Sequence, residues 1–129
     1  MTSKFFLEKS NIIVIATIKG LTIEFDFKFI LDTGASISIL DESVAKQLGF
    51  VAKDMKMGDR LTTVGGGKQS KLLKLPKFSL FGKEILDYEM NVVSLPSQIL
   101  FLADGLIGMD FLLRFPQVKI DFVNKTIET

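Results

Sequence analysis

Asp32 is the residue of this sequence best placed to do chemistry. It ends the apolar run Phe25–Leu31 and is followed by Thr33 and Gly34. Such a run predicts a strand buried on at least one face, so the Asp32 carboxylate reaches the interior and needs hydrogen-bond donors there. The small residues from Thr33 to Ala35 let backbone N–H groups and one hydroxyl surround the acid and fix its orientation. An ordinary tight turn with a solvated aspartate fits the same residues, because Asp, Thr and Gly are common in turns.

Composition narrows the chemistry to carboxylates. The chain has no cysteine and no histidine, which removes Ser/His/Asp and Cys/His catalysis, the usual zinc sites and thiol redox chemistry. The sequence therefore predicts neither a metal nor an organic cofactor. The formal net charge is +1 and the charged residues are scattered, so no basic stripe predicts nucleic-acid binding.

Length and hydropathy predict one domain, 1–129, that can bury a core. The hydrophobic fraction of 47% is high for so short a chain, and no apolar run has the length of a membrane span. A buried subunit interface and a dense core both fit this excess. The first ten residues lack the apolar core and cleavage site of a secretory signal, so we expect a cytoplasmic protein unless an anchor lies upstream.

A second stretch repeats the pattern around Asp32. Leu106-Ile107-Gly108 joins two apolar residues to a glycine and then opens a short apolar helix, Met109–Phe115, which Pro116 ends. Two occurrences of this apolar-glycine pattern in one chain are a more specific signal than one Asp-Thr-Gly tripeptide.

Together, Ile30–Ser36 and Leu106–Gly108 resemble the paired signature of the single-domain, retropepsin-like aspartic proteases of the retroviral type. The bacterial and retrotransposon members are the closest match. The resemblance runs from Ile12 to Ile127 through strands, motif, glycine-rich hairpin, second motif, helix and final hairpin in the family's order. It implies an all-β fold, a closed barrel with one or two short helices. It also implies an aspartic-type endopeptidase that hydrolyses peptide bonds of protein substrates.

The resemblance implies a role for each matching residue. The catalytic residues would be Asp32, Thr33 and Gly34, with the Thr33 hydroxyl bonding across a dimer to the opposite loop. The residues implied to hold the substrate chain are Gly34, Ala35 and Ser36, with Val64, Gly65, Gly66 and Gly67 lying over it. Leu106, Ile107 and Gly108 would support the site, and Gly108 would let the second motif approach the first closely.

The glycine-rich region Met57–Leu75 predicts a hairpin with a tip at Gly65–Gly67. Such a tip lets backbone approach a ligand closely, and by resemblance it is the flap that closes over a bound peptide. A surface hairpin without a ligand fits the same residues. A phosphate-binding loop does not, because Gln69 stands where that motif needs Ser or Thr.

The count of motifs predicts the oligomeric state. Only one Asp-Thr-Gly occurs, and one carboxylate cannot fill both roles of a water-activating pair. Activity would therefore need a twofold homodimer in which Asp32 meets its own copy, and two such carboxyls share a proton. Viral members usually place an acid at the position of Ser36 and an arginine at that of Met109, and both are missing here. A noncatalytic dimerisation or peptide-binding module and a plain β-barrel with a coincidental motif stay as alternatives.

Local signals place the other elements. We expect strands at Asn11–Ile18 and Leu21–Leu31, with Ile23, Phe25, Phe27 and Phe29 on one face, and further strands at Phe78–Phe81, Ile85–Val93 and Ile99–Leu102. Asp41–Leu48 predicts a helix with Asp41 as N-cap and Gly49 just beyond its end. Val118–Phe122 and Thr126–Glu128 predict a hairpin that either joins a dimer sheet or closes the barrel. Lys4–Leu7 is a candidate dimer segment by resemblance.

Overall fold

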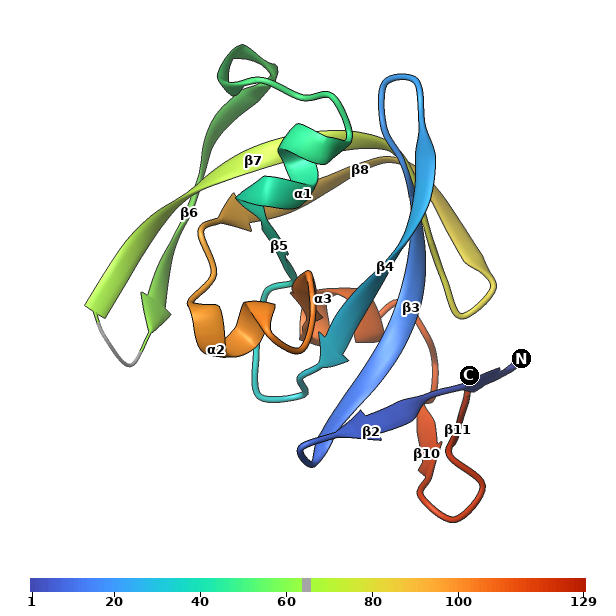
Figure 1. Cartoon of the computed structure of the whole chain (residues 1–129). Coiled ribbons are helices and arrows are strands. Elements are labelled where there is room, and N and C mark those ends of the chain that lie inside the picture. The colour runs from blue at the N-terminus through green and yellow to red at the C-terminus, as the bar shows by residue number, and fades with distance from the viewer. Residues whose placement is uncertain (64–65) are drawn as a thin grey trace.

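A computed structural model describes residues 1–63 and 66–129 of the chain (Figure 1). Its strands are β1 (Thr2–Lys4), β2 (Phe6–Glu8), β3 (Asn11–Lys19), β4 (Glu24–Leu31), β5 (Ile39–Asp41), β6 (Met55–Thr63), β7 (Gly66–Leu80), β8 (Lys83–Val93), β9 (Gly105–Ile107), β10 (Lys119–Asp121) and β11 (Thr126–Glu128). The helices are α1 (Glu42–Gln47), α2 (Ser97–Leu100) and α3 (Met109–Leu112), and Ala52–Asp54 forms a 3₁₀ turn.

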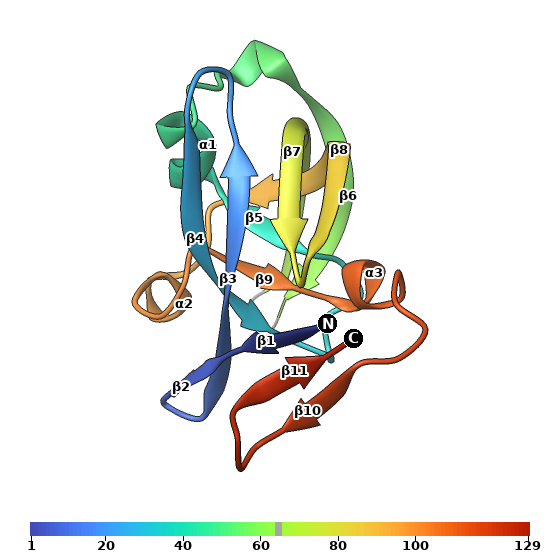
Figure 2. The ribbon, with the colours of Figure 1, turned by 90° about the vertical axis from the view of Figure 1, so that its right-hand side faces the viewer.

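The strands form two sheets. The larger has the order β2-β3-β4-β9-β5-β8-β7-β6, and a further pairing of β3 with β7 folds it back on itself. The smaller has the order β1-β11-β10 and carries both chain ends (Figure 2). The predicted all-β class is confirmed, although the described part of the chain has more helical segments than the one or two expected.

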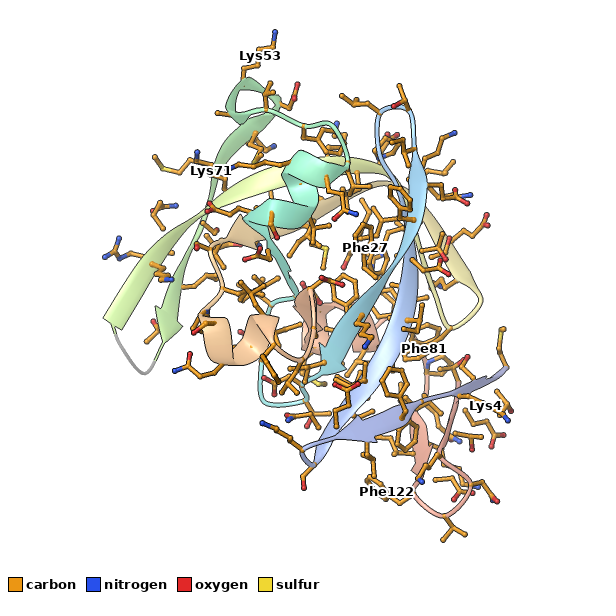
Figure 3. The ribbon with its side chains drawn as sticks, viewed as in Figure 1. Lys4, Phe27, Lys53, Lys71, Phe81 and Phe122 are labelled. Atoms are coloured by element: carbon orange, nitrogen blue, oxygen red, sulfur yellow. The ribbon has the colours of Figure 1, made fainter. Side chains whose placement is uncertain are left out.

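Aromatic side chains fill the space that the larger sheet encloses. Phe29, Phe78 and Phe111 are fully buried, and the Phe78 ring lies 5.9 Å from that of Phe29 and 5.6 Å from that of Phe111. In Figure 3, Phe27 points inward from β4, whereas Lys53 and Phe122 lie at the periphery. Because such rings bury large apolar areas and prefer edge contacts, they fix how the strands pack around α3.

The α1 helix forms as its local sequence predicts. Asp41 is the N-cap and its Oδ2 accepts a hydrogen bond from the Ser43 N–H at 3.0 Å. Gly49 follows the helix with φ +94°, a left-handed conformation that glycine adopts without strain. Asp41 is also buried, and its Oδ1 accepts from the Leu95 N–H at 2.8 Å. The cap therefore ties α1 to the segment that follows β8.

Apolar and polar residues alternate along β4 as predicted, but the apolar residues are not all buried. Phe27 and Phe29 are buried, whereas Ile23 and Phe25 keep 42% and 41% of their surface exposed. The turn begins where the Gly20 N–H donates to the Ile23 carbonyl at 2.7 Å, and the first residues of β4 extend past the packed part of the sheet. The predicted apolar face is therefore buried only over its second half.

The strand expected at Ile99–Leu102 is wrong, because α2 occupies Ser97–Leu100. Pro96 has φ −64° at the N-cap, and the Ile99 N–H donates to the Pro96 carbonyl at 3.0 Å. Proline favours helix starts because its φ is already helical. The α3 helix also ends earlier than expected, after Leu112.

The C-terminal hairpin is confirmed, with Lys125 in the left-handed region at φ 53°. Its β11 strand also pairs with β1 of the same chain, with Ser3 opposite Ile127. The termini are joined as well, since the Thr129 N–H donates to the Met1 carbonyl at 2.9 Å. In the described residues, no helix is long and apolar enough to cross a membrane.

Candidate active site

Three strands bring the two sequence motifs together. Strand β4 pairs in parallel with β9, with Leu31 opposite Ile107, and β9 pairs in antiparallel fashion with β5, with Leu106 opposite Ile39. The end of β4 that delivers Asp32 therefore lies beside the second motif.

Backbone hydrogen bonds orient the half-buried Asp32. Its N–H donates to the Ile107 carbonyl at 2.8 Å, and its carbonyl accepts from the Ala35 N–H at 3.1 Å. Its Oδ1 accepts from the Gly34 N–H at 2.9 Å. Because a donor that belongs to the loop itself holds one carboxylate oxygen, the acid is fixed in direction without a cationic partner.

Two glycines lie at close contacts in this loop. A Cβ on Gly108 would lie 2.7 Å from the Ala35 carbonyl oxygen and 3.0 Å from that of Ile37, closer than real Cβ contacts allow. A Cβ on Gly34 would lie 3.2 Å from Asp32 Oδ1. The second motif thus needs a glycine at 108 to rest directly on the Asp32 loop.

Backbone bonds then join the loop to the start of α3. The Met109 N–H donates to the Ala35 carbonyl at 2.8 Å, and the Asp110 N–H donates to the Ser36 carbonyl at 3.1 Å. The Ser36 and Ala35 side chains take no part in these bonds, so the contacts hold the loop whatever those side chains are.

Sequence reasoning missed a polar pair beneath the loop, Ser38 and Asp110. The Asp110 carboxylate accepts the Ser38 N–H at 3.0 Å to each oxygen, and its Oδ1 accepts the Ser38 hydroxyl at 2.6 Å. The Ser38 Oγ in turn accepts the Gly108 N–H at 2.9 Å. Ser38 is only 1% exposed, and a serine between two isoleucines was the one available signal. This pair connects the first motif to the second through side chains.

Tyr88 packs below the same pair. Its ring lies 4.9 Å from that of Phe78, and the Arg114 guanidinium lies 5.2 Å from the ring centre. Burial, and then the negative charge of Asp110, raises the pKa of the Tyr88 hydroxyl to about 12. Tyr88 therefore stays neutral under the site at ordinary pH.

An apolar wall continues from the Asp32 loop. It is a cluster separate from the main core, in which Leu61, Val93 and Leu95 are buried and Ile37, Ile39 and Ile99 pack against them. These residues come from the loop and β5, from β6, from the end of β8 and the segment that follows it, and from α2. Apolar side chains in this place favour contact with apolar groups of a ligand.

The predicted glycine-rich hairpin consists of β6 and β7. Thr62 pairs with Gly67, and Thr63 pairs with Gly66, so two of the three glycines lie in a strand and not in the tip. Val64 and Gly65, which were expected to lie over a ligand, are outside the described residues.

A polar cluster anchors the base of this hairpin. The register shifts between Met57 and Arg60, and there the Asn91 Oδ1 accepts the Ser70 hydroxyl at 2.7 Å and the Asp59 N–H at 3.1 Å. A Cβ on Gly58 would lie 2.6 Å from both the Asn91 Oδ1 and the Ser70 Oγ. The register shift is therefore stabilised by specific contacts, which fix the hairpin stem to β8.

The predicted site residues differ in exposure. Thr33, Gly34 and Ser36 are exposed, Asp32 and Ala35 are half-buried, and Ile107 and Gly108 are buried. The loop thus presents one exposed side, while the second motif supports it from within. In the part of the chain that the structure describes, no three side chains of metal-binding type gather closely enough to hold an ion.

Comparison with known proteins agrees with this geometry. Residues 14–111 match the model of a family described as aspartyl protease. No curated protein matches the sequence. Among solved structures, a retropepsin-like aspartic protease from Rickettsia conorii aligns with a TM-score of 0.69 and 24% identity over 98% of this chain and 91% of that one.

Two further structures share the fold. The EIAV protease, solved with the inhibitor HBY-793, has a TM-score of 0.65 and 20% identity over 84% of this chain and 91% of its own. The retroviral protease-like domain of Ddi1 from Leishmania major has a TM-score of 0.59 and 24% identity over 90% of this chain and 85% of its own.

Proposed function

We propose that this chain, which belongs to the aspartyl protease family, is an endopeptidase that acts as a homodimer. The observation that carries the proposal is the Asp32 carboxylate, oriented by the Gly34 N–H at 2.9 Å and presented on a loop whose Thr33 and Gly34 are exposed. That arrangement supplies half of a two-carboxylate site. A second copy of the same loop would supply the other half.

A twofold axis beside the loop would bring Asp32 of one chain next to Asp32 of the other. An isologous interface brings identical surfaces together, so Asp32 and Thr33 would each meet their own copies. The exposed Thr33 hydroxyl would donate or accept across the axis and brace the two acids. Because two carboxyl groups in contact cannot both be ionised without strong repulsion, the pair would share one proton.

The chemistry follows from the shared proton. The ionised carboxylate takes a proton from a bound water as the water oxygen attacks the peptide carbonyl carbon, and the protonated carboxyl gives its proton to the carbonyl oxygen. The tetrahedral intermediate then collapses: the C–N bond breaks, the nitrogen gains a proton from the protonated carboxyl, and one hydroxyl of the intermediate gives its proton to the other carboxylate as the new carboxyl group forms. Both acids return to their starting state, so no other reactant is consumed.

The apolar wall supports a preference in the substrate. Ile37 and Ile39 follow the Asp32 loop directly and Leu61 joins them from β6, so apolar side chains next to the scissile bond would be favoured. By the same proposal, the segment Val64 to Gly67 of the glycine-rich hairpin would cover the bound peptide. A cytoplasmic location stays a prediction.

The test is cleavage of a diverse peptide pool by the wild-type chain and by Asp32→Asn, at high protein concentration and from acidic to neutral pH. We expect cuts with apolar flanking residues from the wild type and none from the variant. Sedimentation of the same samples reports the oligomeric state.

A dimer that cuts nothing would favour the noncatalytic dimerisation or peptide-binding module. Equal cleavage by both proteins would point to a contaminant and contradict the role of Asp32. A monomer that cuts only when two copies are covalently linked would support the dimeric site.

A further inference from the structure

A cavity of about 720 Å³ lies between α1, the turn that follows it and the stem of the β6–β7 hairpin. Its apolar lining includes Phe50, Val51 and Met55 and, from β8, Val92 and Val93. Its size falls within the range of about 300–1,000 Å³ that is typical of ligand sites. Among the described residues, no part of the Asp32 loop and no part of the second motif lines it. The cavity shares Val93 with the apolar wall beside the Asp32 loop and is otherwise separate from the candidate active site.

The wall formed by α1 and its turn is held in place by hydrogen bonds. Gly49, at φ +94°, turns the chain out of α1, and the Phe50 N–H returns to the Ala45 carbonyl at 3.0 Å. The Val51 N–H then donates to the Asp54 Oδ2 at 2.7 Å. Val51 is 52% exposed although it is apolar. This side of the cavity is preformed and leaves an apolar side chain open to solvent.

The opposite wall belongs to the hairpin and its sheet. Lys71 of β7 pairs with Val92 of β8, and Leu40 of β5 pairs with Val92 from the other side. The Lys68 Nζ donates to the Ser94 carbonyl at 2.8 Å, which ties the hairpin to the end of β8. Figure 3 labels Lys71 beside this hairpin. A ligand between the two walls would contact the hairpin and α1 at once.

The charged residues at the cavity are mostly cationic. Lys46, Lys68 and Lys71 line it together with one acid, Glu42, and all four are exposed. In the described part of the chain, neither Lys46 nor Lys71 has a carboxylate within 4 Å. The excess positive charge beside the apolar lining complements a ligand with an apolar body and a negative end.

We propose that this cavity binds an apolar carboxylate, with the apolar body against Val51, Met55 and Val93 and the carboxylate beside Lys46 and Lys71. A fatty acid and the carboxyl end of an apolar peptide share this chemistry. Because Lys46 belongs to α1 and Lys71 to β7, the bound carboxylate bridges the helix and the hairpin stem.

The experiment titrates the full chain with decanoate below its micelle concentration, and separately with a short apolar peptide that has a free carboxyl terminus. Calorimetry gives the affinity, and residue-resolved NMR shifts give the place. We expect shifts at 46–52 and 68–71. Whichever of the two ligands binds more tightly identifies the source, and the failure of both overturns the proposal.

Variants distinguish the contribution of the lysine charges to ligand binding from that of the apolar contacts. Lys46→Gln with Lys71→Gln is expected to weaken decanoate about tenfold, since each exposed ion pair contributes up to about 1 kcal/mol. Lys74→Gln is the matched control, because Lys74 is exposed on the same strand and does not line this cavity. Val51→Glu, a surface change that places a negative charge beside the apolar lining, is expected to abolish binding.

Further results would also overturn the proposal. If decanol binds as tightly as decanoate, the lysines do not bind the carboxylate. If Lys74→Gln weakens binding as much as the double variant, the effect of the lysines comes from the net charge of the protein and not from their place at the cavity. Altered binding in Asp32→Asn, or NMR shifts centred on residues 32–38, would place the ligand in the candidate active site. Unchanged binding in Asp32→Asn supports a separate site, whether or not the chain is a peptidase.

Discussion

The Asp110 carboxylate accepts both the backbone N–H and the hydroxyl of Ser38, the latter at 2.6 Å, across 72 residues of sequence. The pair lies directly under the Asp32 loop, because the Ser38 Oγ also accepts the Gly108 N–H at 2.9 Å. Removing the hydroxyl in Ser38→Ala leaves the buried Gly108 N–H without its acceptor, at a cost of about 1–3 kcal/mol. Denaturant unfolding measures this loss as a lower midpoint.

Ser36→Ala is the matched control. Ser36 is on the same loop but exposed, and the bond it makes to Asp110 uses its backbone carbonyl. Its replacement should change the free energy of unfolding by no more than about 0.5 kcal/mol. Equal midpoints for Ser38→Ala and the wild type would mean that the Ser38–Asp110 pair does not hold the two motifs together.

Gly108→Ala tests the close contact of the motifs. The added methyl would lie 2.7 Å from the Ala35 carbonyl oxygen, and backbone on both sides cannot yield easily, so we expect a loss of about 1–3 kcal/mol in the free energy of unfolding. Gly67→Ala is the control: its nearest atom is the Arg60 Nε at 3.1 Å, part of a flexible side chain that can move. A Gly108→Ala protein as stable as Gly67→Ala would disprove the contact.

Tyr88 predicts how stability depends on alkaline pH. Its pKa is raised to about 12 by burial and by Asp110, whereas the unfolded tyrosine ionises near its ordinary value of about 10. Its contribution to stability is therefore complete below pH of about 10 and is lost as pH rises to about 12, by about 1.4 kcal/mol per pH unit. Tyr88→Phe should remove this part of the pH dependence.

The measurement is direct because Tyr88 is the single tyrosine and the chain has no tryptophan. Ultraviolet absorbance of tyrosinate then follows one group through the alkaline titration. Ionisation near the ordinary tyrosine pKa in the folded protein would contradict the burial and charge that the structure assigns to it.

Local signals in the sequence predicted local structure well. Asp41 and Gly49 bound α1 as an N-cap and a left-handed residue should, because each acts on backbone within a few residues of itself. The β6–β7 hairpin and the C-terminal hairpin follow in the same way. The error at Ile99–Leu102 arose because a short apolar run fits a strand or a helix, and the preceding Pro96 selected the helix.

Long-range contacts were beyond local signals. The position of Ser38 against Asp110 depends on β4, β5 and β9 meeting, and no spacing in the sequence encodes that meeting. The same holds for the buried Asn91 and Ser70 and the exposed Asp59 at the base of the hairpin, which form one hydrogen-bonded cluster. The apolar cavity beside α1 was missed for the same reason, since its two walls are far apart in the chain.

Thr33 provides the sharpest test of the proposed dimer, because its side chain is exposed in a single chain. Thr33→Val keeps the shape and removes the hydroxyl, so the free energy of unfolding of the monomer should change by no more than about 0.5 kcal/mol. If two symmetric hydrogen bonds cross the interface at about 1 kcal/mol each, the dimer dissociation constant should rise about thirtyfold. Sedimentation equilibrium over a range of concentrations measures that constant.

Thr22→Val is the control for this test, because Thr22 is also exposed but lies in the β3–β4 turn, away from the Asp32 loop. Its dissociation constant should equal that of the wild type. Below the dissociation constant, the dimer concentration falls with the square of the chain concentration, so Thr33→Val should lose cleavage at low concentration and regain it at high concentration. A Thr33→Val dimer as tight as the wild-type dimer would place the interface elsewhere on the chain and leave Asp32 without its partner.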